Sequence, residues 1–137
     1  MKPNFYKFKL NTDNRGSLVA IEELQDIPFH IKRIYYIFAA KENVIRGFHA
    51  HKQLQQVLIC VHGTCTVLLD DGIEKHEIYL DDPTKGLFID KMIWREIYDF
   101  SPDAVLLVLA SEHYREEDYI RNYDDFELLC SKGSGLV

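Results

Sequence analysis

The chain has 137 residues, a length that suits one domain (residues 1–137) with a full hydrophobic core. Its formal net charge of −6 argues against nucleic acid as a partner. Its longest apolar runs, such as residues 104–110, are far too short to cross a membrane, and residues 1–5 lack the hydrophobic region of a signal peptide. We therefore expect one domain without a membrane or nucleic-acid partner.

Short β-strand patterns recur along the chain, with turn signals between them. We predict strands at residues 5–10, 18–22, 31–38, 55–61, 64–69, 73–80, 86–89, 93–98 and 104–110. We predict turns at residues 12–17, 26–28, 62–63, 70–72, 81–83 and 101–103, of which Asp70-Asp71-Gly72 is the clearest hairpin signal.

The pattern changes after residue 112. Residues 112–118 are acidic and are expected to form a solvated face. Residues 123–129 predict a helical turn, and residues 131–137 are expected to be a frayed tail. The sequence thus predicts an all-β fold, a cupin-type double-stranded β-helix (jelly roll), with a short C-terminal helical segment. The strands before residue 40 are surplus to one barrel and could cross to a neighbouring subunit.

The cysteines suggest a reducing compartment. Cys60, Cys65 and Cys130 are odd in number and form no C-x-x-C pair. This argues against a disulfide framework or a zinc knuckle and fits the cytoplasm. Cys60 and Cys65 lie in β-like runs, so we expect them to be small core residues.

Two histidines stand out in the segment Arg-Gly-Phe-His-Ala-His at residues 46–51. Residues two apart in a strand point to the same side, so His49 and His51 should present two imidazoles together. Imidazoles can ligate a metal or transfer protons near neutral pH. Satisfied surface histidines are the plainer alternative, although Arg46 beside the pair at a barrel mouth favours a function.

A metal site of the cupin kind would need further ligands. Where such a motif has glutamate, this chain has Gln56 (or Gln55), and an amide is a poor ligand for a divalent cation. The second motif offers Arg95 in place of a third histidine, and a guanidinium repels a metal. Because metal sites normally use three or four protein ligands, we expect no metal.

Arg33 interrupts an apolar strand pattern and faces the same side as Tyr35. A charge there needs a partner, either an internal carboxylate or a bound anion such as phosphate. Either Tyr35 or Tyr36 could face a barrel interior and contact a ligand. Trp94 is expected in the core. We give His30, His62 and His76 structural or surface roles and leave the role of His113 open.

Five segments together resemble the sugar 3,4-ketoisomerases of the cupin superfamily, often called FdtA-like or QdtA-like. These segments are residues 15–18, 31–36, 46–51, 60–72 and 118–124, and the resemblance extends over about residues 5–128. The family acts on dTDP-4-keto-6-deoxyglucose. The motif R-G-x-H-A-H with its flanking blocks is quite specific, whereas a bare H-x-H is not.

The resemblance implies an isomerase that makes a dTDP-3-keto-6-deoxyhexose without metal or other cofactor. An aminotransferase then uses this product for the deoxyamino sugars of lipopolysaccharide, O-antigen or other surface polysaccharide. The resemblance also implies a cytoplasmic homodimer with exchanged N-terminal strands. Two alternatives stay open: a nucleotide-sugar epimerase of the same fold, and a non-catalytic sugar-binding cupin.

The resemblance also assigns roles to site residues. His49 is the base that works at carbon, and His51 moves a proton between the C3 and C4 oxygens. Arg33 and Arg46 hold the pyrophosphate or polarise the enediolate, and Tyr35 is a plausible contact to nucleotide or sugar.

Arg15 and Arg95 occupy positions that line the sugar pocket in this family. Some members have tyrosine at the first position, and some have histidine at the second. This chain has arginine at both. We therefore leave the C4 configuration of the product, galacto or gluco, undetermined.

Overall fold

The structure is a computed structural model that describes residues 1–135. The strands are β1 (Asn4–Lys7), β2 (Leu10–Asp13), β3 (Gly16–Val19), β4 (Arg33–Ile37), β5 (Arg46–His51), β6 (Gln56–His62), β7 (Cys65–Asp70), β8 (Lys75–Leu80), β9 (Lys85–Ile89), β10 (Trp94–Tyr98), β11 (Val105–Ala110) and β12 (Tyr119–Ile120). The helices are a 3₁₀ turn, η1 (Glu116–Asp118), and α1 (Tyr123–Gly135). Neither helix has the length and apolar character that a bilayer span requires.

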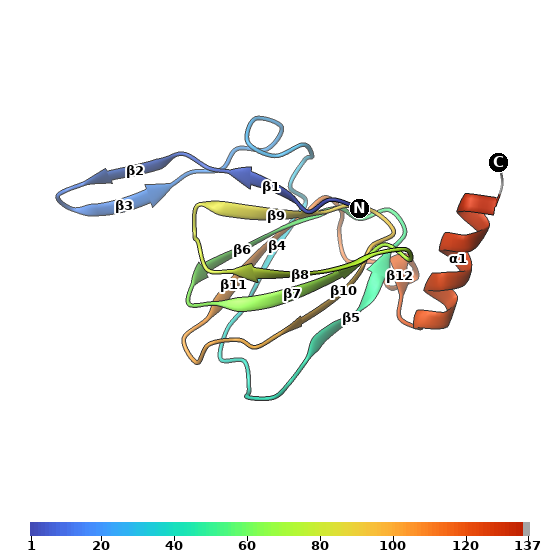
Figure 1. Cartoon of the computed structure of the whole chain (residues 1–137). Coiled ribbons are helices and arrows are strands. Elements are labelled where there is room, and N and C mark those ends of the chain that lie inside the picture. The colour runs from blue at the N-terminus through green and yellow to red at the C-terminus, as the bar shows by residue number, and fades with distance from the viewer. Residues whose placement is uncertain (136–137) are drawn as a thin grey trace.

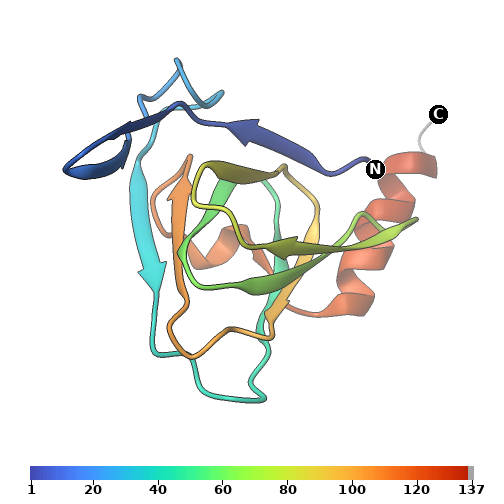
Figure 2. The same ribbon diagram turned by 60° about the vertical axis from the view of Figure 1, so that its left-hand side comes forward.

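Two five-stranded antiparallel sheets form the body of the molecule. One has the order β1-β9-β6-β11-β4, and the other has the order β12-β5-β10-β7-β8. The sheets lie on opposite sides of an enclosed interior, with α1 at one side (Figures 1 and 2). The predicted jelly roll with a C-terminal helical segment is therefore confirmed.

The core lies between the two sheets, because alternate side chains of each strand point inward. In β7 the inward residues Cys65, Val67 and Leu69 are almost completely buried. They pack in one cluster with residues of β6 and β11, among them Cys60 and Leu106. Cys60 and Cys65 are thus core residues, as the sequence predicts.

Strand β6 is buried on both faces, which explains its continuous apolar run. The outer face, with Val57 and Ile59, is covered by Phe8, Ile27 and Phe29 from the N-terminal region. Burying both faces removes the polar alternation expected of a half-solvated strand.

The N-terminal region differs from the sequence-based expectation. The predicted strand at residues 5–10 is divided between β1 and β2, and most of the predicted turn at residues 12–17 belongs to β2 and β3. The turn is shorter than predicted because the Arg15 amide donates to Oδ1 of Asp13 at 2.8 Å. The β2–β3 hairpin pairs only with itself and projects from the two main sheets (Figure 1).

The C-terminal region also differs from expectation. The acidic run at residues 112–118 contains η1 and leads into β12, which pairs with β5. The predicted frayed tail is wrong for residues 131–135, because α1 continues to Gly135; residues 136–137 lie outside the described part. The helix is anchored by Phe126, which is fully buried against Trp94, Ala50 and Ile120.

Truncation of Phe126 tests this anchor. We expect Phe126→Ala to lower the free energy of unfolding by about 3–5 kcal/mol, because it leaves a cavity under α1. Leu128 is on the same helix and is 55% exposed, so Leu128→Ala should change stability by less than about 0.5 kcal/mol. Urea denaturation measures both. Equal destabilisation by the two variants would contradict this account of how α1 is held.

Candidate active site

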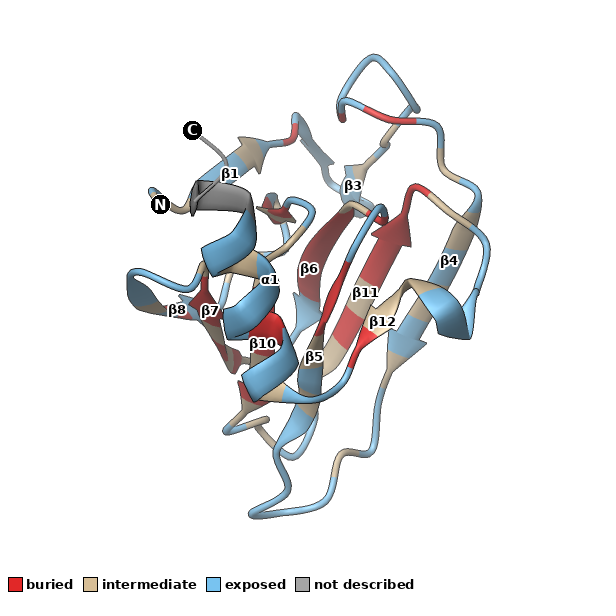
Figure 3. Ribbon diagram, turned by 90° about the vertical axis from the view of Figure 1, so that its right-hand side faces the viewer, coloured by how far each residue is buried: buried red, intermediate tan, exposed pale blue. Residues whose placement is uncertain are grey.

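His49 and His51 lie together on β5, between β12 and β10 (Figure 3). Their ring centroids are 4.8 Å apart in an edge-to-face arrangement. His51 has no exposed surface, whereas His49 is partly exposed. The ring of Tyr119 packs against both, with its centroid 4.9 Å from His49 and 4.4 Å from His51. The predicted pairing of the two imidazoles is therefore present.

A β-bulge turns His49 to its position. The register between β5 and β10 shifts at Phe48, and the backbone φ angles of Gly47 and Phe48 are +95° and +55°. A Cβ on Gly47 would lie 2.8 Å from the carbonyl oxygen of Arg95, so glycine is required for this close approach. The bulge brings the Gly47 carbonyl 3.0 Å from Nδ1 of His49.

This contact fixes the tautomer of His49. A carbonyl oxygen only accepts hydrogen bonds, so Nδ1 of His49 carries the proton and donates it to Gly47. The other ring nitrogen, Nε2, then carries the lone pair of a neutral imidazole. His49 is thus arranged as a base that acts through Nε2.

His51 has different surroundings. Its Nδ1 lies 3.3 Å from Oδ2 of Asp118, and neither ring nitrogen has a hydrogen-bond partner. The Asp118 carboxylate accepts hydrogen bonds from the backbone amides of Gln53 at 2.8 Å and Leu54 at 3.2 Å. The acidic run at residues 112–118 is therefore not wholly solvated, since the side chain of Asp118 is only 11% exposed.

A buried arginine lies across from the histidines. Arg95 is 1% exposed and is paired with His49 in the strand register. Its Nη1 donates to Oε1 of Gln56 at 2.5 Å and its Nη2 donates to the Ile93 carbonyl at 2.8 Å, while its buried Nε has no partner. Gln56 in turn donates to the hydroxyl of Tyr35 at 3.1 Å.

This network engages the side-chain amide of Gln56. Its amide oxygen, the only atom of the side chain that could ligate a cation, accepts the hydrogen bond from Arg95. Within residues 1–135, no three His, Cys, Asp or Glu side chains are placed to hold a metal ion. The Arg95 guanidinium would repel a metal cation placed beside it.

The electrostatics keep both imidazoles neutral. Burial, followed by the positive charge of Arg95, lowers the pKa of His49 to about 4 and that of His51 to about 2. Burial also lowers the pKa of Arg95, to about 10, which leaves it a cation at neutral pH. The site thus combines two neutral imidazoles, the buried Arg95 cation and the nearby Asp118 carboxylate.

Arg33 and Tyr35 lie beside this network. The Arg33 guanidinium stacks on the rings of Tyr35, at 4.7 Å, and Tyr114, at 5.2 Å. No carboxylate pairs with Arg33 among the described residues 1–135, so an internal salt bridge is not what holds it. Tyr35 faces the interior, whereas Tyr36 is 61% exposed on the outer face. This answers which tyrosine of the pair faces the site.

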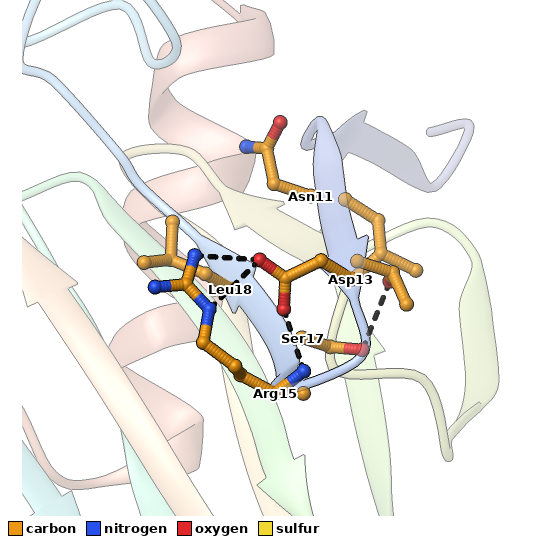
Figure 4. A pocket seen from close by; sticks show the side chains of 8 residues that line it. Asn11, Asp13, Arg15, Ser17 and Leu18 are labelled. Atoms are coloured by element: carbon orange, nitrogen blue, oxygen red, sulfur yellow. Dashed lines mark hydrogen bonds and ion pairs between the residues drawn. The ribbon is translucent and has the colours of Figure 1, made fainter.

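The other two predicted arginines lie apart from the histidines. Arg46 is exposed at the start of β5 and lines a hollow beside Phe38 and Val44. Arg15 is 86% exposed at the hairpin tip, where its Nε and Nη2 donate to Asp13 (Figure 4). Their roles stay predictions.

A hollow of about 720 Å³ is formed by the hairpin alone, from residues 10–13 and 15–18 (Figure 4). It contains neither histidine.

The remaining histidines fit structural or surface roles. His30 pairs with Glu23, and His62 and His76 also face carboxylates; His113 is exposed.

The sequence-based site omits Asp118 and Tyr119 as contacts of the histidines. The signal that could have found them is that residues 118–124 form one of the blocks that resemble the isomerase family.

Comparison with known proteins gives one consistent result. Residues 1–131 match the family model FdtA, described as "WxcM-like, C-terminal". The chain is 54% identical over 132 residues, 96% of its length and 95% of the relative's, to the TDP-4-oxo-6-deoxy-alpha-D-glucose-3,4-oxoisomerase of Aneurinibacillus thermoaerophilus.

Two solved structures are equally similar in shape. A 3,4-ketoisomerase from Helicobacter canadensis is 50% identical, with a TM-score of 0.92 and coverage of 96% of this chain and 98% of that one. A variant of the 3,4-ketoisomerase QdtA from Thermoanaerobacterium thermosaccharolyticum, in complex with TDP-4-keto-6-deoxyglucose, is 47% identical, with a TM-score of 0.93 and coverage of 95% and 94%.

The lowered pKa values predict a pH dependence of stability. An unfolded histidine titrates near 6.5, so below that pH the unfolded state binds protons that folded His49 and His51 do not. We expect the free energy of unfolding to fall between pH 7 and pH 5, by up to about 1.4 kcal/mol per pH unit for each neutral imidazole. Urea denaturation at each pH measures this slope.

A His51→Asn variant is the control for the pH dependence of the free energy of unfolding, because it removes one of the two buried imidazoles. Its slope should be shallower than that of the unsubstituted chain. Identical slopes, or ring resonances of both histidines that titrate near pH 6.5 in NMR spectra, would contradict the assignment of neutral buried imidazoles.

Proposed function

We propose that this chain, which belongs to the FdtA family of sugar-nucleotide 3,4-ketoisomerases, is a metal-independent enzyme. It converts dTDP-4-keto-6-deoxyglucose into a dTDP-3-keto-6-deoxyhexose. The enzyme is an isomerase of dTDP-linked sugars. One observation carries the assignment of the base: Nδ1 of His49 donates to the Gly47 carbonyl, which leaves a lone pair on Nε2 of an imidazole whose pKa burial lowers to about 4.

In the first step, His49 removes the proton from C3 of the sugar. The neighbouring C4 carbonyl makes this proton acidic, since the electron pair left at C3 delocalises onto the C4 oxygen. The proton moves to Nε2 of His49, and the sugar becomes an enediolate. Neutral imidazole is the competent form, and the lowered pKa of His49 ensures that form at neutral pH.

The enediolate carries a negative charge that Arg95 is placed to stabilise. Its guanidinium is buried beside both imidazoles, and its Nε has no hydrogen-bond partner among residues 1–135. A preorganised charge in a site that excludes water stabilises a developing anion more than water does. Gln56 and the Ile93 carbonyl hold two of the other donors, so the guanidinium needs no reorganisation during the reaction.

The second step returns both protons. His51 accepts the proton of the C3 hydroxyl and delivers one to the C4 oxygen, while His49 delivers its proton to C4. The C3 oxygen becomes the carbonyl and the C4 oxygen becomes the hydroxyl. No electrons enter or leave the sugar, so the chemistry requires only the two imidazoles and a cation.

The predicted binding residues surround this centre unevenly. Arg33 rests on two aromatic rings beside the histidines, a suitable position for holding the pyrophosphate. Tyr35 faces the interior and contacts the sugar or the nucleotide. Arg46 lies farther along β5, where it can meet the more distant phosphate or nucleoside end of the substrate.

We further propose a homodimer that exchanges its N-terminal strands. Within residues 1–135 the β2–β3 hairpin pairs with no strand of the two main sheets, and its Leu10 and Leu18 are 51% and 59% exposed. Strand β4 is a sheet edge whose outer side shows the exposed residues Ile34 and Tyr36. In such an exchange Arg15, at the hairpin tip, lines the sugar pocket of the neighbouring subunit.

By family membership we also propose a cytoplasmic role. The product would be a 3-keto sugar nucleotide that an aminotransferase converts into a deoxyamino sugar for surface polysaccharide such as O-antigen. The reducing cytoplasm suits the free thiols of Cys60, Cys65 and Cys130.

Product analysis tests the function. We expect the purified enzyme, treated with EDTA, to convert dTDP-4-keto-6-deoxyglucose into a 3-keto isomer whose NMR spectrum also gives the C4 configuration. His49→Asn should reduce turnover at least about 10²- to 10⁴-fold, because it removes the general base. The exposed His62 is the matched control, and His62→Asn should retain the original rate.

Three outcomes would contradict this function. A product that keeps its 4-keto group but has inverted configuration at C3 or C5 would indicate an epimerase. Binding without turnover would indicate a sugar-binding protein. Undiminished turnover in His49→Asn would remove His49 as the base.

Sedimentation tests the dimer. We expect Leu18→Asp to weaken association at least about tenfold, since it places a charge in an apolar contact worth more than 1.4 kcal/mol. Ile73, at the tip of the β7–β8 hairpin, is 88% exposed, so Ile73→Asp should leave association unchanged. A monomeric parent chain, or equal association of the three proteins, would contradict strand exchange.

A further inference from the structure

The orientation of the His51 ring needs a cause that the proposed reaction does not supply. His51 is completely buried, and neither ring nitrogen has a hydrogen-bond partner in the part of the chain that the structure describes. A proton shuttle must present one defined nitrogen, with a known protonation state, to the sugar oxygens. Something beside the ring must therefore choose between its two tautomers.

Asp118 is the charged group in contact with that ring. Its Oδ2 lies 3.3 Å from Nδ1 of His51. A carboxylate accepts hydrogen bonds and cannot donate when ionised, so its contact is favourable only when Nδ1 carries the proton.

The Asp118 carboxylate is itself held firmly. Its two oxygens accept hydrogen bonds from the amides of Gln53 and Leu54, and its backbone carbonyl accepts one from Lys52 at 3.0 Å. Three successive amides that follow His51 thus converge on one residue. Because β12 also pairs with β5 through Tyr119 and His51, Asp118 has little freedom to move away from the ring.

We propose that Asp118 is a positioning residue that holds His51 with its proton on Nδ1 and its Nε2 free to exchange protons with the sugar oxygens. This inference rests on the proposed shuttle role of His51. It makes the two histidines equivalent in design, since the Gly47 carbonyl does for His49 what the Asp118 carboxylate does for His51. Both imidazoles then offer Nε2 as the working atom.

A purely structural role for Asp118 is the competing explanation. Its carboxylate satisfies two backbone amides, and that alone would keep residues 52–54 in place. The two explanations differ at His51: a structural cap leaves the tautomer of the ring indifferent to the charge at residue 118, whereas a positioning residue controls it.

The tautomer can be measured directly in the unsubstituted enzyme. With ¹⁵N-labelled histidine, NMR at pH 7 distinguishes a protonated Nδ1 from a protonated Nε2, and a His51→Asn variant assigns the resonances. We expect His51 to carry its proton on Nδ1. A proton on Nε2, or a mixture of tautomers, would overturn the proposal without any need for a variant at residue 118.

The second measurement compares Asp118→Asn with Asp71→Asn. Asp71 also accepts hydrogen bonds from two successive amides, those of Ile73 and Glu74, but it lies on the β7–β8 turn. Both variants lose a carboxylate that caps backbone amides. We expect only Asp118→Asn to shift the His51 tautomer and to lower turnover, by about 10- to 100-fold.

The results separate this inference from the proposed function. If the unsubstituted enzyme does not isomerise the sugar, the function fails, while the tautomer measurement still tests Asp118. If Asp118→Asn retains the tautomer and the turnover, or loses turnover with the tautomer unchanged, Asp118 is not the positioning residue. Loss of turnover in Asp71→Asn as well would point to a structural effect and would also overturn the inference.

Discussion

The burial of one guanidinium determines the character of the site. Arg95 lies inside the barrel with 1% of its surface exposed, and no carboxylate of residues 1–135 forms an ion pair with it. Burying such a charge costs free energy unless its donors have hydrogen-bond acceptors. Here the acceptors are Gln56 and the Ile93 carbonyl. Burial and, after it, this positive charge keep both nearby imidazoles neutral, and the charge also favours an anion over a metal cation beside it.

The scaffold converts this electrostatic environment into geometry. Strand β5 carries both histidines, and the bulge at Gly47 and Phe48 brings the first of them into contact with the Gly47 carbonyl. Neighbouring strands then supply the fixed partners: β10 supplies Arg95 and the segment at β12 supplies Tyr119. Because these groups belong to paired strands rather than to free loops, their positions are set by the sheet before any substrate binds.

The sequence predicts the architecture of this protein better than it predicts the contacts between distant residues. Local alternation and turn chemistry suffice for strands such as β7 and β8, and the pair at His49 and His51 follows from the period of a strand. The pairing of β12 with β5 joins residues nearly 70 positions apart, so local patterns do not show it. For that reason the sequence alone predicts Asp118 to be part of a solvated acidic run, whereas in the structure it contacts His51. The hairpin carrying Arg15 is a similar case, since its partner is not in its own chain under the proposed strand exchange.

The central claim is that neutral His49 transfers a proton from C3 to C4 of the sugar through an enediolate. The most direct measurement is the position of solvent deuterium in the product after one turnover in ²H₂O, read by NMR. Because the proton on His49 can exchange with solvent before it returns, this account predicts deuterium at C4 of a 3-keto product. Deuterium at C3 or C5 of a sugar that keeps its 4-keto group would contradict the claim.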